Sequence, residues 1–229
     1  MDLFIYRIFN ALGDSIILST YFKAFDIKRV YYNRAELDLL QTIMKMYDVH
    51  DVEFIPQQER IQTTMIDIVR QLHKKRVNVL QLEKTGDQLI VTAQLESHHE
   101  SAKDRSIQLY EALPHIKYNM SIKQVGREKT VEKLYEIMNN SVQHISIDSG
   151  TAWFAASLRL DTTVISKNGY YFPSSYHYMR YLDSQPTVDV YQQHGKGVKI
   201  PNEIEFNQAI AENKPHSVIS YQSYLEQVK

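Results

Sequence analysis

The sequence predicts an α/β protein built on parallel sheets. Three observations support this class. Short apolar segments rich in β-branched and aromatic residues alternate with segments of helical spacing, the connections between them are short, and only 7 Gly and 6 Pro occur in 229 residues. Strands that alternate with helices usually pair in parallel, with helices packed on the sheet. We therefore expect two sheets, each covered by helices on both faces, with a cleft between them.

The first half of the chain supplies strands separated by helical segments. Residues 3–9 (LFIYRIF) predict the first strand, and the turn NALGDS leads from it into an apolar helix. Further strands are expected at KRVYY, DVEFIP and VNVLQL, and helices at ELDLLQTIMKMYD and ERIQTTMIDIVRQLHKK. The polar break TGD at residues 85–87 marks the expected boundary between a first domain, residues 1–85, and a second, residues 86–229.

The same alternation continues in the second half. Strands are expected at QLIVTAQL, NMSIKQV, QHISID and TTVIS, and helices at KDRSIQLYEAL, REKTVEKLYEIMNN, TAWFAASL and NEIEFNQAIAEN. The tyrosine-rich stretch at residues 170–181 fits either an aromatic cluster that covers the second sheet or the border of a ligand site.

Composition and the N-terminus exclude several classes of protein. Lys plus Arg (26) nearly balances Asp plus Glu (27), which excludes a polybasic binder, and the lack of cysteine excludes disulfides, thiolate metal sites and cysteine nucleophiles. The start MDLFIYRIFNALGDS lacks the basic region and cleavage site of a signal peptide, and no apolar run reaches the roughly 18–20 residues of a membrane-spanning helix. We expect a cytoplasmic protein.

Two strand-to-helix turns carry the candidate chemistry. In open parallel sheets, ligands bind beyond the carboxyl ends of the strands, where helix N-termini favour anions and glycine permits close backbone approach. Helix capping by Asp or Ser is the alternative for both turns. Neither turn matches a dinucleotide fingerprint or a P-loop. The residues are Asn10, Gly13, Asp14 and Ser15 in the first turn, and Asp148, Ser149, Gly150 and Thr151 in the second.

Together these turns resemble those of bacterial heptosyltransferases of the ADP-heptose:lipopolysaccharide type. YRIFNALGDSIILSTYFKAF is similar to the opening strand, GD turn and helix of that family, and DSGTAWFAASLRLDTTVIS to its late DSG-x-x-H-x-A-A-A-L turn, helix and strand. Thr151 stands where the family has proline and Trp153 where it has histidine, so the contacts of that histidine are not transferred. The indole of Trp153 either stacks on a sugar or base or packs under its helix.

The resemblance implies the GT-B architecture, in which two Rossmann-like domains hold the acceptor and the nucleotide sugar on opposite sides of a cleft. It implies an inverting glycosyl transfer that needs no metal and no cofactor besides the nucleotide-diphosphate sugar as co-substrate. A carboxylate takes the proton of the attacking hydroxyl while amide N–H groups and cations stabilise the leaving diphosphate. By motif position the base is Asp14, and the donor-binding residues are Asp148, Ser149, Gly150, Thr151, Lys103, Arg105 and Glu128.

The last three of these residues have a plainer alternative. Lys103 and Arg105 are assigned to the donor phosphates and Glu128 to the ribose hydroxyls, but solvated surface charge explains all three equally well. The pair His98 and His99 gives no metal site, because adjacent side chains on an extended segment point in opposite directions and no third ligand follows at regular spacing.

The leading interpretation is a nucleotide-sugar-dependent glycosyltransferase that moves a hexosyl, pentosyl or heptosyl group to a hydroxyl acceptor. A saccharide acceptor stands narrowly ahead of a hydroxymethylated base in DNA. The neutral net charge argues against a long DNA footprint, whereas 16 tyrosines favour stacking on a flat acceptor. The alternatives are a non-catalytic nucleotide-binding module used for protein interaction, and a sugar-nucleotide epimerase or hydrolase on the same fold.

Overall fold

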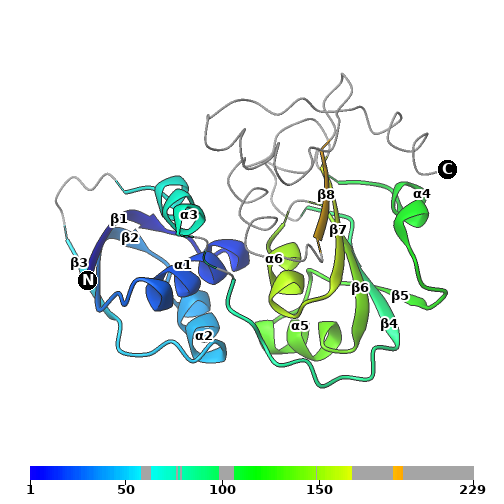
Figure 1. Cartoon of the computed structure of the whole chain (residues 1–229), viewed down its shortest axis with the longest axis horizontal. Helices are drawn as coiled ribbons and strands as arrows, with labels where there is room; N and C mark the ends of the chain where they lie inside the picture. Colours follow the sequence, from blue (N-terminus) through cyan, green and yellow to red (C-terminus); the bar gives the residue numbers. More distant parts are fainter. Residues whose placement is uncertain are drawn as a thin grey trace.

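The protein contains two parallel β-sheets (Figure 1). The computed structural model describes residues 1–57, 63–75, 77, 79–97, 106–147, 149–166 and 188–192. The first sheet has three strands in the order β1-β2-β3, and the second has five in the order β5-β4-β6-β7-β8. Every strand pair within the sheets is parallel. The predicted α/β class with two Rossmann-like parallel sheets is confirmed.

The first sheet follows the expected alternation of strands and helices. Its elements are β1 (Asp2–Ile8), α1 (Leu12–Ala24), β2 (Arg29–Ala35), α2 (Asp38–Met46), β3 (Glu53–Pro56) and α3 (Met65–Lys74). Helix α3 begins later than the apolar spacing predicts, because Thr63 forms a parallel bridge with Ile5 at the open edge of β1. Thr64 and Asp67 then exchange side-chain and backbone hydrogen bonds that start the helix.

The second sheet is larger. Its elements are β4 (Ile90–Gln94), α4 (Leu109–Ala112), the 3₁₀ helix η2 (Leu113–His115), β5 (Ser121–Gln124), α5 (Val131–Met138), β6 (Ser141–Ser146), α6 (Gly150–Ser157), β7 (Asp161–Ser166) and β8 (Val188–Gln192). Sequence analysis left β8 unassigned. The tyrosine-rich stretch and the helix expected in NEIEFNQAIAEN lie outside the described residues.

The expectation of a strand at VNVLQL is wrong. Residues 77 and 79–82 belong to no strand. Their backbone is used elsewhere: the Leu80 N–H donates to Thr20 Oγ1 on α1 (3.4 Å), and the Leu82 N–H donates to the Ser157 carbonyl on α6 (2.9 Å). Val79 is buried in the core. The apolar run is therefore a connector that packs along the junction of the two halves.

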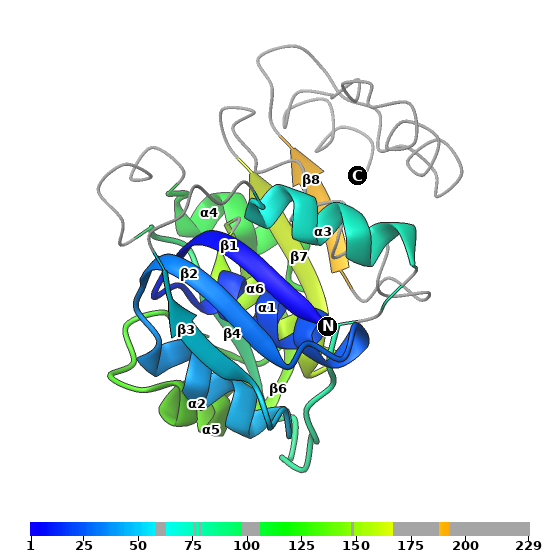
Figure 2. The same cartoon turned by 90° about the vertical axis from the view of Figure 1, so that its left-hand side faces the viewer.

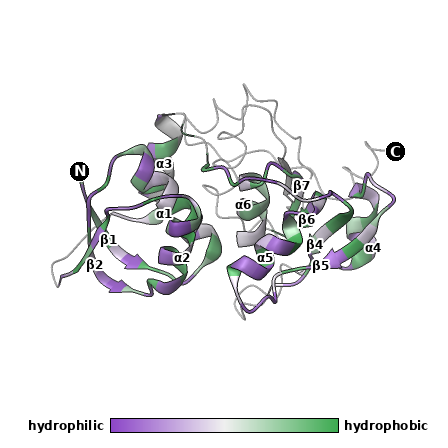
Figure 3. Cartoon of the chain, turned by 90° about the horizontal axis from the view of Figure 1, so that it is seen from below, coloured by the Kyte–Doolittle hydropathy of each residue, from purple (hydrophilic) through white to green (hydrophobic). Residues whose placement is uncertain are grey.

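The helices of the two sheets pack directly on each other. Helix α1 contacts α6, and α2 contacts α5, so these helices form a double layer between the sheets (Figures 1 and 3). One continuous apolar core extends through these layers, with members from Leu3 on β1 to Val164 on β7. A smaller core lies on the other side of the second sheet and includes Ala112 of α4. The two sheets thus share most of their buried apolar surface.

Helices cover both faces of the second sheet but only one face of the first. In the part of the chain that the structure describes, no helix lies over the outer face of β1 and β2 (Figure 2). Phe4 and Tyr6 on this face are 44% and 53% exposed, and the Phe4 ring stacks on Tyr31 at 4.7 Å. The expectation of helices on both faces is therefore wrong for the first sheet. Within the same described ranges, no helix is long and apolar enough to cross a bilayer.

Candidate functional site

The strand order of the second sheet creates a switch point between β4 and β6. From β4 the chain crosses to β5 on one side and then returns to β6 on the other. At the carboxyl ends of these strands the Ile147 N–H donates to the Gln94 carbonyl (3.0 Å). Open α/β sheets bind ligands in the crevice outside such a point. Ser149 and Gly150, which begin α6, lie in the turn that leaves it.

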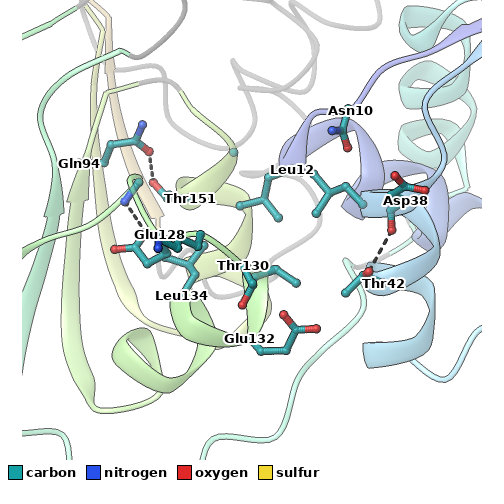
Figure 4. Close-up of a pocket in the computed structure, with 15 residues that line it drawn as sticks. Asn10, Leu12, Asp38, Thr42, Gln94, Glu128, Thr130, Glu132, Leu134 and Thr151 are labelled. Carbon is teal, nitrogen blue, oxygen red and sulfur yellow. Dashed lines mark hydrogen bonds between the residues drawn. The ribbon is translucent and has the colours of Figure 1, made fainter.

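A cavity of about 630 Å³ lies between the two sheets, where sequence analysis expects a cleft (Figure 4). The first turns of α1, α2, α5 and α6 all line it, because each helix begins at the carboxyl end of a strand. Four helix N-termini, each with a partial positive charge and free backbone N–H groups, therefore face one space. The lining residues are Asn10, Leu12, Asp38, Leu39, Thr42, Gln94, Gly126, Glu128, Lys129, Thr130, Val131, Glu132, Leu134, Gly150 and Thr151.

The charged side chains of this cavity are mostly acidic. Among the described residues, Asp38, Glu128 and Glu132 line it together with one cation, Lys129. Glu128 accepts a hydrogen bond from the Gly126 N–H (2.7 Å), and hydrogen bonds from its own backbone N–H and from Thr130 lower the pKa of Glu132. Carboxylate oxygens accept hydrogen bonds from hydroxyl groups, and backbone N–H groups donate to anions. The cavity is chemically suited to a hydroxyl-rich ligand that carries a limited anionic group.

Two glycines bring α1 and α6 together. A Cβ atom on Gly150 would lie 2.7 Å from Leu12 Cβ and 2.9 Å from the Gly13 nitrogen. A Cβ atom on Gly13 would lie 3.0 Å from Trp153 Cδ1. The close backbone approach that sequence analysis expects of both glycines is therefore an approach of one helix to the other. Trp153 is 3% exposed and packs in the shared core, as the packing alternative for this residue predicts.

Asp14 lies within the first turn of α1 and not in a turn before the helix. Burial raises the pKa of its carboxyl group from 3.8 to about 6, although a helix N-terminus favours the charged form. The described residues offer this carboxylate no hydrogen bond or ion pair, and the N-cap position belongs to Ala11, so Asp14 is not a cap. Asp14 is not among the residues that line the 630 Å³ cavity; Asn10 and Leu12 of the same turn are.

The hydroxyls of the second turn point toward the sheet. Ser149 Oγ and Thr151 Oγ1 both donate to Gln94 Oε1, at 2.7 and 2.6 Å (Figure 4 shows the second of these bonds). Ser149 Oγ also lies 2.9 Å from Ser146 Oγ. Ser149 is the N-cap of α6, yet its side chain makes no capping hydrogen bond. The capping alternative is therefore wrong for Ser149 as well.

A buried histidine on β6, His144, lies against the Thr151 side chain. His144 Nε2 lies 3.0 Å from Thr151 Oγ1, and His144 Nδ1 lies 3.0 Å from Thr92 Oγ1. Because the Thr151 hydroxyl hydrogen is used toward Gln94, the hydrogen of the neutral imidazole is assigned to Nε2 and Nδ1 accepts from Thr92. Burial lowers the pKa of His144 to about 3, which keeps the ring neutral.

Thr92, Gln94 and His144 are parts of the site that the sequence did not predict. The available signal was the alternation of polar residues near the carboxyl ends of β4 and β6, where Thr92 and Gln94, and His144 and Ser146, occur two residues apart. All four are buried. A strand that places polar side chains on a helix-covered face needs partners for them.

The remaining predicted residues are distributed as follows. Asn10 and Glu128 line the cavity, and the buried Ser15 hydroxyl has no hydrogen-bond partner among the described residues. Among the described residues, no group of three His, Asp or Glu side chains is placed to hold a metal ion. Asp148, Lys103, Arg105, His98 and His99 lie outside the described residues.

Comparison with known proteins adds a distant structural similarity. No family model and no curated protein matches the sequence. A solved structure of similar fold is the bacterial iron-containing dodecameric glycosyltransferase TibC from enterotoxigenic E. coli H10407, with a TM-score of 0.48 and 11% sequence identity. The match covers 84% of this chain and 63% of that one, so this chain spans less than two thirds of the length of TibC. A likeness at this level assigns neither an activity nor site residues to this chain.

Proposed function

We propose that this protein is a nucleotide-sugar-dependent glycosyltransferase that transfers a hexosyl, pentosyl or heptosyl group to a hydroxyl acceptor. The observation that carries the proposal is the pair of turns at the junction: the first turn of α1 carries a partly buried carboxylate of raised pKa, and Leu12 and Gly13 of that turn pack against Gly150 in the turn that leaves the switch point of the second sheet. The resemblance to heptosyltransferases rests on the same two turns. The proposed division of the chain is residues 1–85 on the acceptor side and 86–229 on the donor side.

Asp14 is the proposed general base. The acceptor hydroxyl attacks the anomeric carbon, Asp14 takes its proton, and the bond between the anomeric carbon and the diphosphate oxygen breaks. This single displacement inverts the anomeric centre and releases the nucleoside diphosphate. A carboxyl group with a pKa of about 6 remains mostly ionised at neutral pH and is a stronger base than an exposed aspartate. The proposal requires no metal ion.

The proposed donor site occupies the side of the cavity formed by the second sheet. The diphosphate would lie at the N-terminus of α6, which begins at the switch point, with Lys103, Arg105 and the Asp148 turn completing the site. Glu128 follows β5, the strand next to β4, where Rossmann-like folds place the carboxylate that accepts from ribose hydroxyls. Its location on the cavity wall supports this role.

A saccharide remains the preferred acceptor. On the side of the first sheet, the polar lining side chains of the cavity are Asn10, Asp38 and Thr42, and no Lys or Arg of that half is among the described lining residues. A DNA acceptor would bring phosphates, which proteins hold mainly with Lys and Arg. An amide, a carboxylate and a hydroxyl are instead suited to the hydroxyl groups of a sugar.

The first experiment measures donor binding. The thermal unfolding of the full-length protein is followed in the presence of UDP-, GDP- and ADP-sugars. A ligand at about 100 times its Kd stabilises the folded state by about 2.7 kcal/mol, which is easily resolved. Lack of stabilisation by every nucleotide sugar at millimolar concentration would contradict the proposal.

The second experiment measures turnover of the sugar that binds best. Incubation with a panel of saccharides and with hydroxymethylated DNA should give a glycosylated product and free nucleoside diphosphate. Product without any acceptor would instead identify an epimerase or hydrolase. Binding without turnover over the whole panel would identify a non-catalytic nucleotide-binding module.

A further inference from the structure

We infer that Gln94 is a positioning residue that holds the α6 turn in place for the donor diphosphate. This inference rests on the proposed function, because it names the group that fixes one wall of the proposed site. Gln94 lies at the carboxyl end of β4, at the switch point, and it is 8% exposed where it lines the cavity.

One oxygen atom of Gln94 joins β4 to α6. Gln94 Oε1 accepts from Ser149 Oγ at 2.7 Å and from Thr151 Oγ1 at 2.6 Å, across 55 and 57 residues of sequence. The amide orientation is set by Nε2, which donates to the Glu96 carbonyl (3.3 Å). Gly126 packs against the same side chain, since a Cβ on Gly126 would lie 2.9 Å from Gln94 Cδ. The amide therefore has little freedom to turn.

This arrangement reverses the expected roles of Ser149 and Thr151. Both hydroxyls donate to Gln94 and so face the sheet. The Ser149 side chain makes no cap bond, which leaves the backbone N–H groups of the first turn of α6 as the donors that face a ligand. Ser149 and Thr151 thus contribute through the placement of the backbone, and Gln94 sets that placement.

The two hydroxyls depend on Gln94 to different degrees. Thr151 Oγ1 also lies 3.0 Å from His144 Nε2 and 3.3 Å from Ser146 Oγ, so two anchors to β6 remain when Gln94 is changed. Ser149 keeps one anchor to β6, the Ser146 hydroxyl at 2.9 Å, besides its contact with Thr151. The start of the turn should therefore loosen more than the first helical turn behind it.

The chain contains a matched control. Gln143 on β6 is fully buried and also makes two hydrogen bonds, from Nε2 to the His115 carbonyl (2.7 Å) and from the Lys117 N–H to Oε1 (3.0 Å). These bonds tie β6 to the segment after α4 and do not involve α6. Gln143→Leu therefore removes an equivalent buried amide from the same sheet without changing the α6 turn.

The test compares Gln94→Leu, Gln94→Glu and Gln143→Leu in the full chain. Hydrogen exchange of peptides that cover residues 149–157 is measured first, without ligand. We expect exchange about tenfold faster in Gln94→Leu, a smaller increase in Gln94→Glu, which keeps the acceptor oxygen but loses the Nε2 donation to the Glu96 carbonyl, and no change in Gln143→Leu. Equal exchange in wild type and Gln94→Leu would overturn the inference, as would exchange in Gln94→Glu as fast as in Gln94→Leu.

The second readout is kinetic. With the nucleotide sugar that stabilises the wild type, we expect Gln94→Leu to raise the donor KM about tenfold and to leave the acceptor KM unchanged, and Gln143→Leu to change neither. An unchanged donor KM in Gln94→Leu overturns the inference and leaves the proposed function standing. If the wild type binds no nucleotide sugar, the proposed function fails, and the exchange measurement still decides whether Gln94 holds the turn.

Discussion

The two glycine turns meet at one point of the molecule but are built in opposite ways. The turn at α6 has its hydroxyls hydrogen-bonded to Gln94, with a buried neutral histidine behind them. The turn at α1 holds a carboxylate whose pKa burial raises to about 6 and a buried Ser15 hydroxyl without a partner. The Ser149 and Thr151 hydroxyls of the α6 turn therefore have hydrogen-bond partners, whereas the Ser15 hydroxyl of the α1 turn has none among the described residues.

From this difference we expect the α6 turn to hold its backbone in place and the α1 turn to supply the reactive group. A fully hydrogen-bonded polar network gives a rigid wall and has little left to donate or accept. A partly buried carboxylate without a partner destabilises the folded state and persists where its chemistry is needed. On this basis we expect substitutions in the first turn to trade activity against stability, and those in the second turn to lower stability alone or with binding.

The largest effect is expected from Asp14→Asn. The amide cannot accept the proton of the acceptor hydroxyl, so the transfer rate should fall by about 10²- to 10⁴-fold while donor affinity stays the same. Initial rates at saturating donor check this. Asp26→Asn is the control, because Asp26 is an exposed residue at φ 49°, a conformation that asparagine tolerates. A variant within a few fold of wild type would remove Asp14 from the chemistry.

The same substitution should stabilise the protein in a pH-dependent way. The folded-state pKa of Asp14 is about 6 against 3.8 for the free group, so its contribution to stability is fully present below about pH 4 and is lost as the pH rises to about 6. Two units of pKa correspond to about 2–3 kcal/mol. Asp14→Asn should therefore be more stable than wild type by that order at pH 8 and equal to it near pH 3.5, as measured by urea unfolding. Equal stability at both pH values would show that the pKa of Asp14 is not raised in the folded state.

The contact between the turns predicts unequal effects of alanine at the two glycines. Gly150→Ala places a Cβ against the backbone of Gly13 and should lower the free energy of unfolding by about 1–3 kcal/mol. Gly13→Ala meets the edge of the Trp153 ring at 3.0 Å, and the better helix propensity of alanine offsets part of the clash, so its effect should be smaller. Urea unfolding at pH 7 measures both, and the reverse order would contradict the geometry described for the junction.

A smaller effect is expected when one hydroxyl is removed from the hydrogen-bonded turn at the start of α6. Thr151→Val leaves the His144 Nε2–H and one position on Gln94 without a partner, which should cost about 1–2 kcal/mol of stability. Thr42→Val removes an exposed hydroxyl that donates to the Asp38 carbonyl within α2, and its effect should stay below about 0.5 kcal/mol. Similar losses in the two variants would show that the network under α6 adds nothing to stability.

The sequence predicted the parts of this site that depend on local pattern. The strands and helices follow from apolar spacing, and both glycine turns follow from their position between a strand and a helix. The strand expected at VNVLQL is not found, because an apolar run indicates burial and does not by itself indicate strand pairing. Here the segment packs against α1 and α6.

The interactions within the site could not be predicted from the sequence, for a different reason. That Gly13 and Gly150 touch each other, and that Gln94 binds Ser149 across 55 residues, depends on how two sheets pack. The raised pKa of Asp14 likewise results from burial by distant elements. Local pattern therefore predicted the two turns, while only the packing shows which polar groups in them have hydrogen-bond partners among the described residues.

The shared core also affects how the chain must fold during synthesis. Helix α1 leaves the ribosome long before α6, which packs against it. At about 5–20 residues per second, the covering helix follows after on the order of ten seconds. During that interval the side of α1 that packs on α6 has no native partner, so we expect chaperones to bind the first half of the nascent chain until α6 is made.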